Sequence, residues 1–336
     1  MTGITRVSPL VSVIVTVHNT PVFIEEAIES LLGQTFCRED VEIVVVSDFS
    51  DPSLERSCSR RGIAFTVAPG SSFAQAIARG LEQAAGDVVA FLDQDDAYDP
   101  RRLALVMEVF DGDRAVSYYQ NNVKFIDERG KGCHPTLTWG LPWPFRTTTF
   151  SGRLKRVHDG EKVRIDPQFG LLKPGFNTTS IAVRRDLVPS ILSLLASLRS
   201  TVDSALFYAA LASPGGIVID PRQLSKYRIH ETNTSLHRDF GTTWLDDLKS
   251  ILLWMQRSGC PEYRTRPLKR VILRSLLRAE ATRTGSGRLT LVKKRMGEMW
   301  PLIEHSQLSW GPCTWALSMV GEALRPRGKP LGDGRQ

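Results

Sequence analysis

Three aspartates, Asp93, Asp95 and Asp96, stand directly after the apolar run Val88–Leu92. Carboxylates this close repel one another, and a bound cation is the usual remedy. Side chains two residues apart on an extended segment point the same way, so Asp93 and Asp95 can reach one object. Hard oxygen ligands suit Mg²⁺ or Mn²⁺, with water and substrate phosphates completing the shell. The spacing favours a divalent metal site; the alternative is a solvated loop in which Asp99 caps the next helix.

Polar side chains also follow two other apolar runs. His18 and Asn19 come after Val11–Val17, and Asp48 comes after Val41–Val46. In an open parallel sheet, ligands bind beyond the carboxyl ends of the strands. If these runs are strands of one sheet, their polar groups and the acidic cluster converge at one edge.

The first hundred residues alternate between strand and helix patterns. Nearly unbroken β-branched runs are typical of strands buried on both faces. Thr20 and Pro21 predict a helix start, with a capping residue followed by proline. We expect strands at Val11–Val17, Val41–Val46, Ile63–Val67 and Val88–Leu92, and helices after Thr20, along 73–81 and after Asp99. This alternation predicts an α/β fold with a mainly parallel sheet and helices on both faces.

Beyond the first hundred residues the pattern of expected elements changes twice along the chain. We expect short strands at Val116–Tyr119, Val123–Ile126, Ser180–Val183 and Ile217–Ile219, with helices at Leu187–Leu198 and Asp203–Leu211. After His237 the pattern is helical, at Trp244–Arg257, Leu268–Ala279, Leu289–Glu304 and Cys313–Leu324. The tail from Arg325 is rich in Gly, Pro and Arg, which predicts mobility.

Composition excludes several classes of protein. The chain has 336 residues, 42% hydrophobic and 24% charged, as in globular rather than disordered or fibrous proteins. The longest apolar runs, Leu10–Val17 and Leu187–Leu198, fall short of the roughly 20 residues of a membrane span. Five scattered cysteines argue against a disulfide framework or zinc site and fit a reducing cytosol.

Five stretches in this order resemble family 2 glycosyltransferases, which have the nucleotide-sugar-binding GT-A fold. The matching stretches are Val11–Asn19, Glu26–Thr35, Ile43–Asp48, Ala84–Asp96 and Lys226–Ser235. The resemblance implies a GT-A domain over 9–235, with a nucleotide-sugar-binding half (9–114) and an acceptor half (115–235). A basic helical region (236–324) and a flexible tail (325–336) would follow.

The resemblance implies roles for residues at the matching positions. Val17, His18 and Asn19 would line the nucleotide pocket, Asp48 would accept a hydrogen bond from the base, and Asp93 would approach the ribose. Asp95 would hold the Mn²⁺ or Mg²⁺ that bridges the diphosphate, with Asp96 beside it. His230 stands where the family often returns a histidine to the metal or diphosphate; a structural or solvent-exposed histidine is the alternative.

A base is also needed, because an acceptor hydroxyl is a poor nucleophile. Similar enzymes place this aspartate at a helix start after the irregular middle, where Asp203 stands. The alternative is that Asp203 caps that helix. With Asp203 as base, the reaction is a single displacement with inversion at the sugar carbon.

The substrates are defined only by class. The donor would be a nucleoside-diphosphate sugar carrying UDP, dTDP or GDP; Phe49 and Ala78 depart from the family pattern and leave the nucleotide open. The acceptor would be a glycan or lipid-linked glycan, as in polysaccharide biosynthesis of the cell envelope. Trp139 and Trp143 could stack against sugar rings, or pack over the sheet. Phe176, Asn177, Thr178 and Thr179 could also border the acceptor site, by their position alone.

The net charge of +7 is concentrated in residues 257–295, which carry twelve Lys or Arg against two Glu. This segment could contact an anionic membrane, bind an acidic polymer or form a solvated face. Leu273 and Leu277 interrupt a clean amphipathic pattern. No nucleic-acid recognition motif accompanies the charge. We therefore expect a cytoplasmic protein, with peripheral membrane contact as one possibility.

Other classes fit less well. A phosphotransferase with an aspartyl nucleophile has its Asp-x-Asp after the first strand, whereas here it follows the fourth. No glycine-rich phosphate loop follows Val11–Val17, which argues against nucleotidyltransferases and dinucleotide-dependent oxidoreductases. The non-enzymatic alternative is a degenerate nucleotide-sugar fold that serves as a binding or scaffold protein.

Overall fold

The computed structural model describes residues 10–19, 21–133, 155–157, 177–233, 240–266, 268–269 and 271–273. The chain divides into two compact units, Met1–Thr265 and Arg266–Gln336. The elements described below belong to the first unit, which extends past the expected domain end at 235. No helix in the described part of the chain has the length and apolar content needed to cross a membrane.

A nine-stranded mixed sheet forms the centre of the first unit, in the order β3-β2-β1-β4-β8-β6-β9-β5, with β7 paired to β9. Its strands are β1 (Val11–Val17), β2 (Val41–Ser47), β3 (Ala64–Val67), β4 (Val88–Asp93), β5 (Ala97–Tyr98), β6 (Val116–Ile126), β7 (Lys155–Val157), β8 (Ile181–Arg184) and β9 (Gly216–Arg228). The first four strands in this order are parallel, and β8 is antiparallel to both β4 and β6. The predicted α/β class is confirmed.

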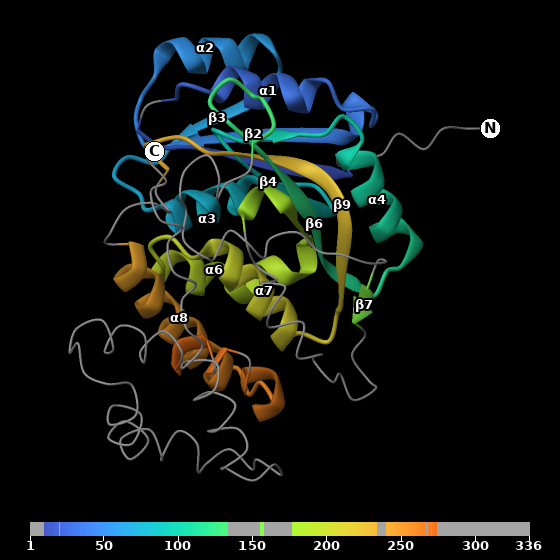
Figure 1. Ribbon diagram of the computed structural model, residues 1–336, viewed down its shortest axis with the longest axis vertical. Coiled ribbons are helices and arrows are strands. Elements are labelled where there is room, and N and C mark those ends of the chain that lie inside the picture. The colour runs from blue at the N-terminus through green and yellow to red at the C-terminus, as the bar shows by residue number, and fades with distance from the viewer. Residues whose placement is uncertain are drawn as a thin grey trace, which may run out of the picture. The chain divides into compact units, whose positions relative to one another are not determined.

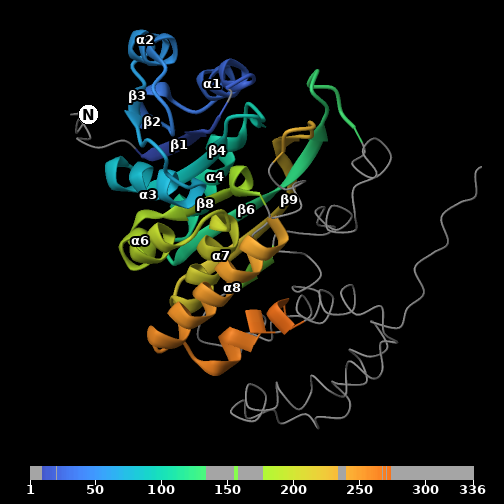
Figure 2. The same cartoon turned by 90° about the vertical axis from the view of Figure 1, so that its left-hand side faces the viewer.

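Helices cover both faces of the sheet (Figures 1 and 2). They are α1 (Ile24–Leu32), α2 (Pro52–Arg60), α3 (Phe73–Gln83), α4 (Arg102–Gly112), α6 (Val188–Ser197), α7 (Val202–Ala212) and α8 (Phe240–Arg257). The odd-numbered valines of β1 pack in one core with α1, α2 and α4. On the opposite face Ile14 lies directly beneath Gly80 of α3. The period-two alternation of β1 therefore supplies both faces with apolar contacts.

Strands β5 and β7 were not expected, and the largest differences from the expected bounds are at β6, β9 and α1. Residues 116–126 form one strand, β6, rather than two, because the polar side chains between them find partners inside the protein. Asn121 accepts a hydrogen bond from Arg102 and donates one to Ser225. Strand β9 runs far beyond the expected Ile217–Ile219 and ends at Arg228. Helix α1 begins at Ile24, with Phe23 at its N-cap, rather than at Thr20.

Candidate active site

The carboxyl ends of β1 and β2 meet at Asp48. Its backbone N–H donates to the Val17 carbonyl at 3.1 Å. Its carboxylate forms an ion-pair contact with Nδ1 of His18 and accepts a hydrogen bond from the Asn19 N–H at 3.3 Å. Asn19 has a positive φ of 57°, which turns the chain after β1. Val17 itself is buried in the core, so only its backbone reaches this edge.

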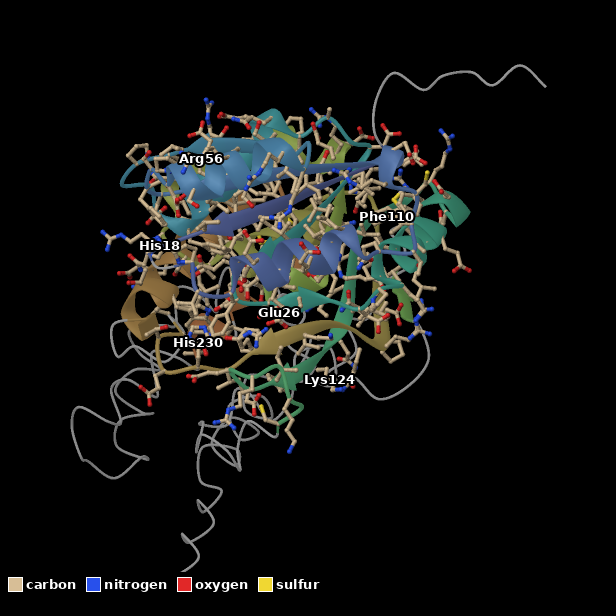
Figure 3. The ribbon with its side chains drawn as sticks, turned by 90° about the horizontal axis from the view of Figure 1, so that it is seen from above. His18, Glu26, Arg56, Phe110, Lys124 and His230 are labelled. Carbon is tan, nitrogen blue, oxygen red and sulfur yellow. The ribbon has the colours of Figure 1, made fainter. Side chains whose placement is uncertain are left out.

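Gln94, which the sequence analysis did not single out, links the end of β4 to the loop after β1. Its amide oxygen accepts from the His18 N–H at 3.2 Å, and its amide nitrogen donates to the His18 carbonyl at 2.7 Å. The loops after β1, β2 and β4 are thereby joined. Figure 3 shows His18 and His230 at the same end of the molecule, away from Phe110. As expected, the polar groups that follow these three strands converge at one edge of the sheet.

Asp93 stands at the end of β4, among other carboxylates. Burial and the charges of Asp96, Asp95 and Asp203 raise the pKa of its carboxyl well above the usual value. Thr16 donates to it at 3.4 Å. Four carboxyl groups, those of Asp93, Asp95, Asp96 and Asp203, therefore lie close enough to influence one another.

Asp96 is buried, with only 1% of its surface exposed to solvent. Its carboxylate accepts hydrogen bonds from the Thr179 hydroxyl at 2.6 Å, the Arg228 N–H at 2.9 Å and the Asn177 side-chain amide at 3.0 Å. Burial, and secondarily the charge of Asp95, raises its pKa to about 7 despite these donors. Asp96 thus ties β4 to β9 and to the turn η4 (Thr178–Ser180), which leaves Asp95 as the more accessible carboxylate.

Asp95 and His230 lie in contact although 135 positions separate them in the chain. Oδ2 of Asp95 is 2.8 Å from Nε2 of His230. The Asn233 amide nitrogen lies 3.3 Å from the same oxygen, and the His230 Nδ1 is 2.8 Å from the Thr232 hydroxyl. At this distance from a carboxylate oxygen Nε2 donates to Asp95. A bound cation would replace that hydrogen bond, with Nδ1–H then donated to the Thr232 hydroxyl and the Nε2 lone pair directed at the ion.

These two side chains fit a divalent cation as part of its shell. Among the described residues, no three His, Cys, Asp or Glu side chains gather around one ion position. One carboxylate and one imidazole leave most positions of an octahedral ion to water and substrate oxygens, and Mg²⁺ in phosphate-handling sites likewise keeps several waters and binds substrate phosphates. The gathering of four carboxyl groups in this region also favours a cation nearby.

Asp203 lies in the first turn of α7, where Thr201 rather than Asp203 is the N-cap. Its Oδ2 accepts from the Asn177 N–H at 3.2 Å, and its Oδ1 from the Ser204 N–H at 2.7 Å. Asn177 has a positive φ of 64° and is buried. By its amide to Asp96 and its backbone N–H to Asp203, Asn177 connects the acidic cluster to the predicted base.

Asp247 of α8 holds the backbone that immediately precedes α7. Its carboxylate accepts from the backbone N–H groups of Arg199, Ser200 and Thr201 at 3.0–3.3 Å. It therefore fixes the turn that leads into α7 and Asp203. Nothing local in the sequence marks Asp247, because its partners lie more than 45 positions earlier. Trp139, Trp143 and most of the basic segment 257–295 lie outside the described residues.

Comparisons with known proteins agree with this geometry. Residues 12–173 match the family model described as glycosyl transferase family 2. An uncharacterized glycosyltransferase of Rickettsia typhi is 25% identical over 254 residues, covering 73% of each chain. One of Nostoc sp. is 27% identical over 240 residues, covering 67% of this chain and 66% of the other.

Two solved structures share the fold. The S. aureus TarS fragment 1–349 in complex with UDP-GlcNAc has a TM-score of 0.58 at 19% identity, covering 79% of this chain and 72% of that one. The mannosyltransferase PcManGT of Pyrobaculum calidifontis, in complex with GDP-Man and Mn²⁺, has a TM-score of 0.52 at 16% identity, covering 93% and 84%. Motif order, sheet topology and these matches agree: the chain is similar to glycosyl transferase family 2 over residues 12–173 and has a fold of the GT-A type.

Proposed function

We propose that the chain is a metal-dependent transferase that moves a sugar from a nucleoside-diphosphate donor to a hydroxyl group, with inversion at the sugar carbon. The observation that carries this proposal is the 2.8 Å contact between Asp95 and His230. It joins the two motifs, far apart in the chain, that the family resemblance assigns to the metal and diphosphate. The ligands of TarS and PcManGT, UDP-GlcNAc and GDP-Man with Mn²⁺, support a donor of this class.

The nucleotide would lie over the ends of β1 and β2. Asp48 is positioned by His18 and Asn19 and presents a carboxylate that can accept a hydrogen bond from the base. His18 is half exposed, so its ring is available to a ligand. Asp93, at the end of β4, would approach the ribose. The diphosphate would then extend toward Asp95 and His230.

The metal would act on the departing diphosphate, and the base would act on the acceptor hydroxyl. Mn²⁺ or Mg²⁺ held by Asp95 and His230 would act as a Lewis acid that offsets charge on the departing diphosphate. Asp203 takes the proton of the acceptor hydroxyl as the oxygen attacks the anomeric carbon. The bond from that carbon to the diphosphate oxygen breaks in the same displacement, so the configuration inverts. Asn177 and Ser204 hold the Asp203 carboxylate in a fixed orientation for this role.

The acceptor we propose is a hydroxyl of a glycan or lipid-linked glycan, at the cytoplasmic face of a membrane. Its binding would involve the segment that contains Trp139 and Trp143, and the basic segment 257–295 would contact anionic lipid. Both ideas come from the sequence, and both can be tested separately from the donor site.

Donor binding can be tested by thermal denaturation with UDP, GDP, dTDP and CMP, each with and without Mn²⁺ or Mg²⁺. A ligand that binds only the folded state stabilises it by about 2.7 kcal/mol at a hundredfold excess over Kd. We expect one nucleoside diphosphate to raise the melting temperature only with metal, and Asp95→Ala to abolish the shift. Asp246→Ala, at an exposed position of α8, should leave it intact. No shift with any nucleotide would contradict the proposed function.

A further inference from the structure

The guanidinium of Arg228 is fully buried at the end of β9. Its Nε donates to the Asp95 carbonyl at 2.8 Å, and one terminal nitrogen donates to the carbonyls of Asp127 and Glu128, each at 3.1 Å. A buried cation is costly unless it is hydrogen-bonded and paired with an opposite charge. The three carbonyls provide hydrogen bonds, but the neutralising charge must come from elsewhere.

That charge comes from helix α1. Oε2 of Glu26 lies 2.5 Å from the other terminal nitrogen of Arg228, and the Glu26 side chain is 50% exposed. The Phe23 ring lies below the guanidinium, 4.5 Å from its central carbon, in a cation–π arrangement. The same ring is 5.5 Å from the His230 ring. Figure 3 shows Glu26 on α1 beside the strand that leads to His230.

Arg228 also contacts both sides of the Asp95–His230 pair through its backbone. Its N–H donates to Asp96, the neighbour of Asp95. Its carbonyl accepts from the Asn233 amide at 3.2 Å, and the same amide lies 3.3 Å from Asp95 Oδ2. The loop after β4 is therefore fixed to both the side chain and the backbone of Arg228, and the loop after β9 is fixed to its backbone carbonyl.

We propose that Arg228 and Glu26 form a positioning pair that holds Asp95 and His230 at the separation needed to bind a divalent cation. The inference rests on the proposed function, which makes Asp95 and His230 the metal ligands. Neither Arg228 nor Glu26 touches the ion. Because α1 is the first helix after His18 and Asn19, the pair also couples the nucleotide end of the site to its metal end.

Glu26→Gln tests this pair at a half-exposed position, where folding should survive. The probe is Mn²⁺ alone, and free Mn²⁺ is measured by electron paramagnetic resonance. Groups that orient metal ligands typically contribute 10–100-fold to metal affinity, so we expect Glu26→Gln to weaken Mn²⁺ binding about tenfold. The matched control is Glu29→Gln on the same helix, also exposed and paired with an arginine, Arg61; its affinity should stay within about twofold of wild type.

A double variant separates positioning from a simple change of electric field. Glu26→Gln combined with Arg228→Met restores the original net charge but not the contacts. If the pair acts by positioning, the double variant binds Mn²⁺ no better than Glu26→Gln. Recovery to wild-type affinity would mean that only the charge of Glu26 mattered, and would overturn the inference. Melting temperature and circular dichroism of each variant identify any that do not fold.

Two further outcomes distinguish this inference from the proposed function. If Asp95→Ala abolishes Mn²⁺ binding while Glu26→Gln binds as wild type, the metal site stands and the positioning pair is wrong. If wild type binds no Mn²⁺, or if Asp95→Ala binds it normally, the metal ligands of the proposed function are themselves wrong, and the positioning role falls with them.

Discussion

Replacing Asp203 with Asn is expected to reduce sugar transfer by about 10²–10⁴-fold, the usual contribution of general base catalysis. Asparagine has nearly the same shape and its amide oxygen can still accept a hydrogen bond from the Asn177 N–H. It cannot take the proton of an acceptor hydroxyl at neutral pH. The loss should therefore fall on turnover, while the affinity for the nucleoside diphosphate stays close to that of the unaltered protein.

Turnover is measured as nucleoside diphosphate released per enzyme, and affinity by calorimetric titration. Asp246→Asn serves as the control, because Asp246 is an exposed carboxylate on α8 that pairs with Lys249. Near-normal turnover in Asp203→Asn would show that another group accepts the proton. A parallel loss of nucleotide affinity would instead indicate a disturbed α7.

Loss of the cation site should have a comparable effect. Lewis-acid stabilisation of a departing oxygen is worth several kcal/mol, and each 1.36 kcal/mol is a tenfold change in rate. We therefore expect chelation with EDTA, or His230→Ala, to lower turnover by about a hundredfold or more. Adding Mn²⁺ back should restore the chelated wild type but not His230→Ala at the same concentration.

The neighbouring exposed residue supplies the control for this experiment. Glu231→Gln changes a charge one position away, on a side chain that faces solvent, and should retain most of the turnover. Full activity after exhaustive chelation would exclude a required metal. In that case, the contact between Asp95 and His230 would need a different role, such as holding β9 against the loop after β4.

Much of the fold could be predicted because its signals are local. The β-branched run Val11–Val17 is strand β1 with the expected bounds, and all seven residues are buried. Errors arose where tertiary contacts override local chemistry. Gln120–Asn122 were expected to break a strand, yet their side chains hydrogen-bond inside the sheet and β6 continues through them. Helix α1 begins late because Pro21–Phe23 form a turn, closed by the Ile24 N–H donating to the Pro21 carbonyl at 3.4 Å.

The site was predictable only in part for the same reason. The rule that polar groups gather beyond parallel strand ends is enough to bring His18, Asp48 and the acidic cluster together. The pairing of Asp95 with His230 came from family resemblance, since their contact depends on where β9 joins the sheet. Arg228 and Asp247 act on partners roughly 50–130 positions away. No sequence period or spacing records such contacts.

Catalytic transfer is tested most directly by measuring the release of nucleoside diphosphate from a panel of nucleotide sugars that includes UDP-GlcNAc and GDP-mannose. The assay contains Mn²⁺ and offers water and a lipid-linked glycan extract as acceptors. We predict release from one donor class, abolished by EDTA and by Asp203→Asn. Metal-dependent binding of a nucleoside diphosphate without release from any donor would contradict the claim and identify a binding protein built on a glycosyltransferase fold.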